Sequence, residues 1–128
     1  MAALLSRLLR DQGRDMEALR LNESAEAAAA EDDVDTQALW RLIRAPIVAR
    51  LDSTDKAEEL ARSAVELALK TDAPALKADA LTALAEVLRI AGQREDALEA
   101  IQQAIALYAE KGDLVSKSRS ENWARTLN

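Results

Sequence analysis

Residues 75–112 read ALKADALTALAEVLRIAGQREDALEAIQQAIALYAEKG, and this stretch decides the fold. Its apolar residues recur at helical spacing on both sides of Gly92, which predicts one helix over about 75–91 and another over about 94–111. Glycine is the usual residue just after a helix end, because it adopts positive φ without a steric penalty. The stretch therefore indicates two helices joined by a tight turn.

Working outward, the same pattern occurs three times, at intervals of about 40 residues. Small residues mark its equivalent positions. They are Ala18, Ala57 and Ala97, then Ala25, Ala64 and Ala104 seven residues later, and Ser6, Ala45 and Ala85 twelve residues earlier. Two antiparallel helices approach closely only where neither carries a bulky side chain at the crossing. We therefore expect these small residues to lie buried between helices.

The repeat predicts an all-α fold: a right-handed stack of about three antiparallel helix hairpins plus a C-terminal capping helix. We expect a single domain over 1–128. Its units span about 1–33, 34–72 and 73–112, and the capping helix spans about 113–127. The predicted helices cover about 2–12, 14–30, 36–50, 55–71, 75–91, 94–111 and 114–126. Pro46 lies inside one of them, where its missing N–H predicts a kink.

Composition excludes several kinds of chemistry. The chain has 28 Ala and 20 Leu but no Cys and no His, which removes zinc and iron–sulfur sites, disulfides and histidine general bases. Adjacent carboxylates such as Glu58 and Glu59 fall in first helical turns, where the helix dipole favours them. The three glycines are isolated, so no phosphate-binding loop is present. We therefore expect no enzyme activity, no cofactor and no metal.

The net charge of −6 argues against nucleic acid as a partner. Most of the excess lies in Glu31, Asp32, Asp33 and Asp35, a cluster typical of a solvated loop, with an acidic docking or cation-binding loop as the alternative. No run of 18 apolar residues occurs, which predicts no membrane span. The first ten residues lack the order of a signal peptide, so we expect a cytoplasmic protein.

The offsets within the third unit resemble those of the tetratricopeptide (TPR) repeat family. The matching residues are Leu84, Ala85, Leu88, Gly92, Ala97, Ile101 and Ala104. The second unit departs from the pattern at Arg44, where an apolar residue is usual, and at Asp52, where glycine is usual. The stretches over residues 24–34 and 81–92 are also similar to the C-terminal repeat arrays of large bacterial ATPase/cyclase-type signalling regulators. This resemblance implies a regulatory role in bacterial signalling.

In TPR stacks the first helix of each unit lines the concave side, so the resemblance implies a partner-binding groove there. Its candidate residues are Arg7, Arg10, Leu42, Ile43, Arg50, Asp79, Glu86 and Arg89. Arginines that flank an apolar middle would suit a protein partner, either a peptide with acidic ends or a helix. The alternative is that these arginines are ordinary solvated positions whose stems cover apolar surface.

Two other functions stay open at this point. One is small-molecule sensing, which predicts a pocket above about 300 Å³ lined by Leu39, Ile43 and Ile47. The other is a purely structural oligomerisation element. The apolar start, with Leu4 and Leu8, predicts either a longer array or a homo-oligomer formed through the N-terminal helix. Trp40 and Trp123 are more typical of core packing than of a ligand platform.

Overall fold

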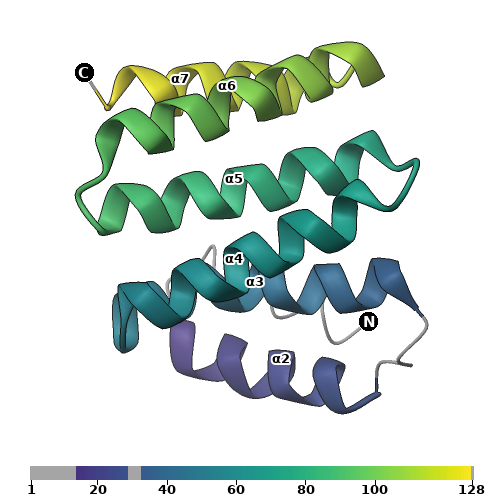
Figure 1. Ribbon diagram of the computed structural model, residues 1–128, viewed down its shortest axis with the longest axis vertical. Coiled ribbons are helices and arrows are strands. Elements are labelled where there is room, and N and C mark those ends of the chain that lie inside the picture. The colour runs from purple at the N-terminus through teal and green to yellow at the C-terminus, as the bar shows by residue number, and fades with distance from the viewer. Residues whose placement is uncertain (1–13, 29–32, 128) are drawn as a thin grey trace.

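The computed structural model describes residues 14–28 and 33–127, and this part of the chain is helical apart from short connections. The all-α prediction is confirmed. With the labels of Figure 1, the helices are α2 (Asp15–Ala28), α3 (Val34–Leu51), α4 (Thr54–Leu69), α5 (Pro74–Ile90), α6 (Arg94–Lys111) and α7 (Leu114–Arg125). The helix expected over 2–12 lies outside the described residues. Within the described ranges, no helix is both long and apolar enough to cross a membrane.

Local sequence fixes where these helices begin and end. Asp33, Ser53 and Asp113 each precede a helix and accept a hydrogen bond from the backbone N–H three residues later, at 3.2, 3.4 and 3.0 Å. Gly92 and Gly112 end α5 and α6 with a φ of 82°, a conformation that other residues rarely adopt.

The helix α3 runs unbroken through Pro46, whose ring is fully buried. Its two neighbours at positions 45 and 47 have no exposed surface either. Packing on both sides of the proline therefore holds this segment helical, although the Leu42 carbonyl lacks its usual N–H partner.

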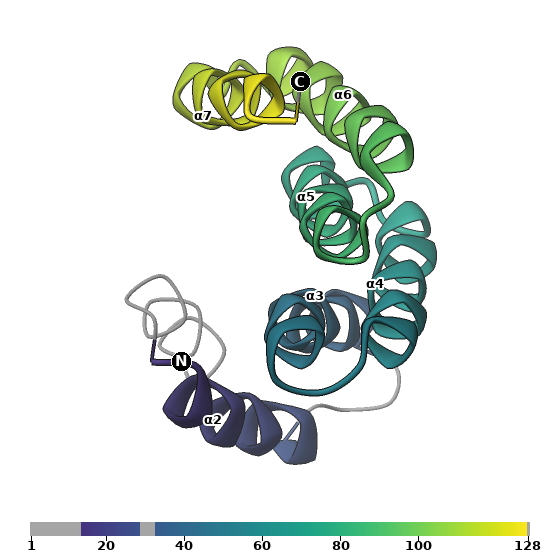
Figure 2. The ribbon, with the colours of Figure 1, turned by 90° about the vertical axis from the view of Figure 1, so that its left-hand side faces the viewer.

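Figures 1 and 2 show the helices following one another along an arc, with α3 and α5 toward its inner side and α4 and α6 on its outer side. Helix α3 packs most extensively against α4, and α5 against α6. Further contacts join α4 to α5, α3 to α5, α6 to α7 and α2 to α3. The connections between α3 and α7 span only two to four residues, so helices that follow one another in the chain lie close together.

The core consists of large side chains interleaved with the repeated alanines. Ala18, Ala45, Ala57, Ala64, Ala85, Ala97 and Ala104 have no exposed surface, and Ala25 is 8% exposed. The expectation of burial is confirmed for these eight alanines, whereas Ser6 lies outside the described residues. Ile43, Ile47, Leu88 and Ile101 are the bulkiest fully buried apolar side chains around them. Small residues let the backbones approach closely, and the larger ones fill the remaining space.

Candidate functional site

Two of the residues expected in a concave groove belong to the core. Leu42 is 2% exposed and Ile43 is 0% exposed, so neither offers surface to a partner. This corrects the expectation for both residues. The physical reason is that α3 is contacted by α2, α4 and α5, which together cover its apolar positions. Arg7 and Arg10 lie outside the described residues.

The Arg50 side chain forms an ion pair with another residue of the chain. Its guanidinium forms a bidentate pair with Asp15 of α2, with Nε–Oδ2 2.9 Å and Nη2–Oδ1 2.7 Å. The hydrogen bonds that Arg50 donates to Asp15 raise the pKa of Arg50 above its ordinary value. The negative charges of Asp15 and Glu86 also raise it, whereas burial opposes them. Arg50 and Glu86 therefore lie within electrostatic reach of each other. A partner would have to compete with Asp15 for the guanidinium.

The remaining expected residues lie along α5. Asp79 is half-buried and accepts a hydrogen bond from the Tyr108 hydroxyl of α6 at 2.6 Å. The Thr82 hydroxyl lies 3.4 Å from the same Tyr108 hydroxyl. Asp79 therefore ties α5 to α6. Glu86 is half-buried, and Arg89 is exposed near the end of the helix.

A polar junction between α2 and α3 explains the unusual Arg44. Asn22 is fully buried and donates from Nδ2 to the Trp40 carbonyl at 2.8 Å, while Arg44 Nε donates to Asn22 Oδ1 at 2.6 Å. The Arg44 Nη2 is buried and forms an ion pair with Glu26 Oε1 at 2.8 Å, without the alignment of a hydrogen bond. The arginine thus stands where the repeat favours an apolar residue because α2 supplies its partners.

Both tryptophan side chains contact other residues of the fold. Trp40 is 6% exposed, and the guanidinium carbons of Arg41 and Arg44 lie 4.3 and 4.5 Å from the centroid of its ring. Its indole N–H donates to Gln37 Oε1 at 3.1 Å. Trp123 is half-buried and packs against the core cluster of α5 and α6.

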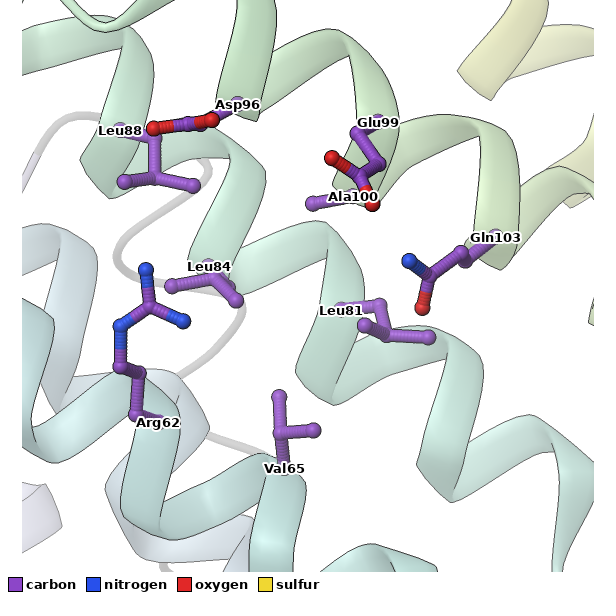
Figure 3. Close-up of a pocket in the computed structure, with 9 residues that line it drawn as sticks. All are labelled: Arg62, Val65, Leu81, Leu84, Leu88, Asp96, Glu99, Ala100 and Gln103. Carbon is purple, nitrogen blue, oxygen red and sulfur yellow. The ribbon is translucent and has the colours of Figure 1, made fainter.

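An open hollow lies elsewhere, between α4 and α6 over α5. Figure 3 shows its lining, and we call it the outer groove because α4 and α6 form the outer side of the arc (Figure 2). Its volume is about 230 Å³. Its lining residues are Arg62 and Val65 of α4, Leu81, Leu84 and Leu88 of α5, and Asp96, Glu99, Ala100 and Gln103 of α6.

The outer groove combines an apolar floor with a charged rim. Leu81, Leu84 and Leu88 are buried at its floor, whereas Arg62, Asp96 and Glu99 are exposed at its rim. The Arg62 Nε already donates to Glu58 Oε2 at 2.8 Å, so its charge is largely balanced. The rim that α6 forms is therefore acidic, because it carries Asp96 and Glu99. Such a surface can bind an apolar side chain that has a positively charged residue next to it.

The sequence interpretation did not find the outer groove. The signal lies in α6, where the small Ala100 faces the leucines of α5 and polar residues stand at positions 96, 99 and 103 on the same helical face. A small residue in that place leaves space above the leucines. Whether the space is filled by another helix depends on the tertiary arrangement.

No known protein-family model matches this chain, and no curated protein matches it in sequence. In the part of the chain that the structure describes, no three carboxylates converge in a way that could hold a metal ion.

Proposed function

We propose that this chain is a non-catalytic, TPR-like repeat module that binds a protein segment, and that the outer groove receives an apolar side chain of that segment. Under this proposal the helices form a right-handed stack of hairpins, with α7 as the capping helix. The observation that carries the proposal is the outer groove itself, whose apolar floor opens to the surface between charged walls. The regulatory role in bacterial signalling follows from the resemblance to the repeat arrays.

The size of the outer groove favours a side chain over a free small molecule. Sites for drug-sized ligands enclose roughly 300–1,000 Å³, whereas this groove has about 230 Å³. The pocket that small-molecule sensing predicts would be lined by Leu39, Ile43 and Ile47, and none of these residues lines the outer groove. One or two aliphatic side chains presented by a helix match the available space better.

The test is binding of helical peptides selected from a display library against the intact chain. Affinities are compared by fluorescence anisotropy between the wild type and Ala100→Phe, which fills the groove. Ala109→Phe, an exposed position on the opposite face of α6, is the matched control. We expect Ala100→Phe to weaken binding at least about tenfold, corresponding to about 1.4 kcal/mol, and Ala109→Phe to leave it unchanged.

Two further variants keep the result interpretable. Glu99→Lys changes only an exposed rim charge, so it tests the groove without risk to the core. Arg89→Glu tests the inner face of the arc, where the resemblance places the binding residues. Loss of binding in Arg89→Glu with full binding in Ala100→Phe and Glu99→Lys would overturn the proposal for the outer groove and return the site to the inner face.

A further inference from the structure

The start of α7 exposes two large apolar side chains. Leu114 is 68% exposed and Val115 is 70% exposed, the highest values among the large apolar residues that the structure describes. They are consecutive, and they follow the turn at Gly112. We call this segment, with Lys117 and Arg119, the α7 tip. An apolar pair held this far into water is costly unless something covers it.

Three cations lie close to Leu114 and Val115 in the sequence. Lys111 comes before it, and Lys117 and Arg119 lie within the next helical turn and a half. The pKa of Asp113 is lowered first by its hydrogen bonds from Ser116 and further by the charges of Lys111 and Arg119. Both cations therefore lie within electrostatic reach of the helix start. Residues 111–119 contain these three cations and one carboxylate, Asp113, so the segment has a net charge of +2 in a chain with a net charge of −6, and Glu110 and Glu121 flank it.

The outer groove has the complementary character. Its floor is apolar, and Asp96 and Glu99 stand on its α6 side with Glu95 next to them in the sequence. The cation on the opposite wall, Arg62, is paired with Glu58. An apolar residue with a cation about one helical turn away would place the cation beside these carboxylates. Leu114 with Lys117, and Val115 with Arg119, both have that spacing.

We propose that the α7 tip of a second copy of this chain docks in the outer groove. This rests on the proposed function of the groove and names its occupant. Leu114 or Val115 enters above Leu84 and Ala100, and the basic residues of the tip face Asp96 and Glu99. The α7 tip and the outer groove are different surfaces, and each copy carries both. The same contact can therefore form either a reciprocal dimer or an open chain of copies.

The contact is tested by sedimentation velocity of the intact chain at concentrations up to about 1 mM, because interfaces that bury little surface are weak. The tip variant is Leu114→Glu with Val115→Glu, and the groove variant is Ala100→Phe, with Glu99→Lys as its exposed alternative. Met16→Glu is the matched control, because Met16 is also an exposed apolar residue, at 57%, but lies on α2. We expect the wild type and the control to associate, and each variant to raise the dissociation constant at least about tenfold.

Mixing the two variants gives the decisive result. The tip variant still has an open groove and the groove variant still has an intact tip, so an equimolar mixture forms a heterodimer through one contact although neither variant associates alone. A wild type that keeps the mass of one chain throughout, or a mixture that stays monomeric while the wild type associates, would overturn the inference. If the wild type stays monomeric and selected peptides still need an open groove, only the identity of the occupant is wrong. If the peptides ignore Ala100→Phe, the proposed function of the groove falls as well.

Discussion

Arg44 of α3 donates a hydrogen bond across 2.6 Å to Asn22 of α2, a residue with no exposed surface. Asn22 also donates to the Trp40 carbonyl, so both the nitrogen and the oxygen of its side-chain amide bond to α3 and join it to α2. The other buried residues of α2 are only Ala18 and Ala25. The attachment of α2 to α3 therefore depends on polar contacts to an extent that the leucine-rich contacts of α5 and α6 do not.

Asn22→Leu is expected to destabilise the fold by about 1–3 kcal/mol, because it leaves the Arg44 Nε and the Trp40 carbonyl without this partner in a buried place. Urea unfolding followed by tryptophan fluorescence measures the change. Adding Arg44→Met to Asn22→Leu should cost less than the sum of the two single changes, since the first already breaks the pair. Strict additivity would show that the two residues act independently.

Arg50→Met is expected to loosen α2 selectively. The variant loses the bidentate contact with Asp15, a partly exposed pair whose contribution we place at about 1 kcal/mol or less. Hydrogen exchange should show faster exchange in α2 and unchanged exchange in α5 and α6. Arg89→Met, which removes an exposed arginine of α5, is the control and should change neither region. Uniformly faster exchange in every helix would contradict a local role for the pair.

Ala104→Leu is expected to destabilise the chain by about 1–3 kcal/mol or more, because the added atoms meet a tightly packed neighbouring helix. Ala104 is fully buried in α6. Ala109→Leu, at an exposed position of the same helix, should change stability by no more than about 0.5 kcal/mol. Thermal unfolding followed by circular dichroism compares the two. Equal effects would remove the central reason for the alanine repeat.

Acidification is expected to weaken the starts of α3 and α7. The pKa values of Asp33 and Asp113 are lowered by hydrogen bonds from Thr36 and Ser116, so each ionised carboxylate is favoured in the folded chain. Their contribution is therefore present above the ordinary carboxyl pKa, near 4, and is lost as the pH falls through the lowered values. Asn at both positions can still accept the cap hydrogen bonds but does not titrate.

The Asp33→Asn/Asp113→Asn double variant should therefore lose less stability than the wild type as the pH falls below about 4. Urea unfolding at a series of pH values supplies the comparison. Parallel stability curves for the two proteins would mean that neither cap contributes to the acid sensitivity.

The helices were predictable because their signals are local. The helix expected over about 94–111 is Arg94–Lys111 in the structure, with Gly112 ending it. The helix expected over about 55–71 ends earlier, at Leu69. Thr71 explains the difference, because its hydroxyl donates to the Ala68 carbonyl and accepts from the Ala73 N–H, which favours a turn over another helical residue.

The candidate site was less predictable. Leu42 and Ile43 fit a groove on the repeat pattern, yet α3 is covered on several sides and both are buried. Arg50 and Asp79 fit the same groove and instead tie α3 to α2 and α5 to α6. The outer groove arises from Ala100 opposite Leu84, two residues on different helices, and no local pattern joins them.

The sequence by itself determined the helical class, the helix ends and the burial of the repeated alanines, because propensity, capping and apolar period act within a few residues of the chain. Only the tertiary structure decided that Asn22 pairs with Arg44, that Asp15 pairs with Arg50 and that a hollow lies over the buried leucines of α5, between α4 and α6. These outcomes depend on which helix faces are brought together. The sequence pattern does not specify at any one position which helix faces pack together, because a stripe of alanines and leucines can pack against many neighbouring helices equally well.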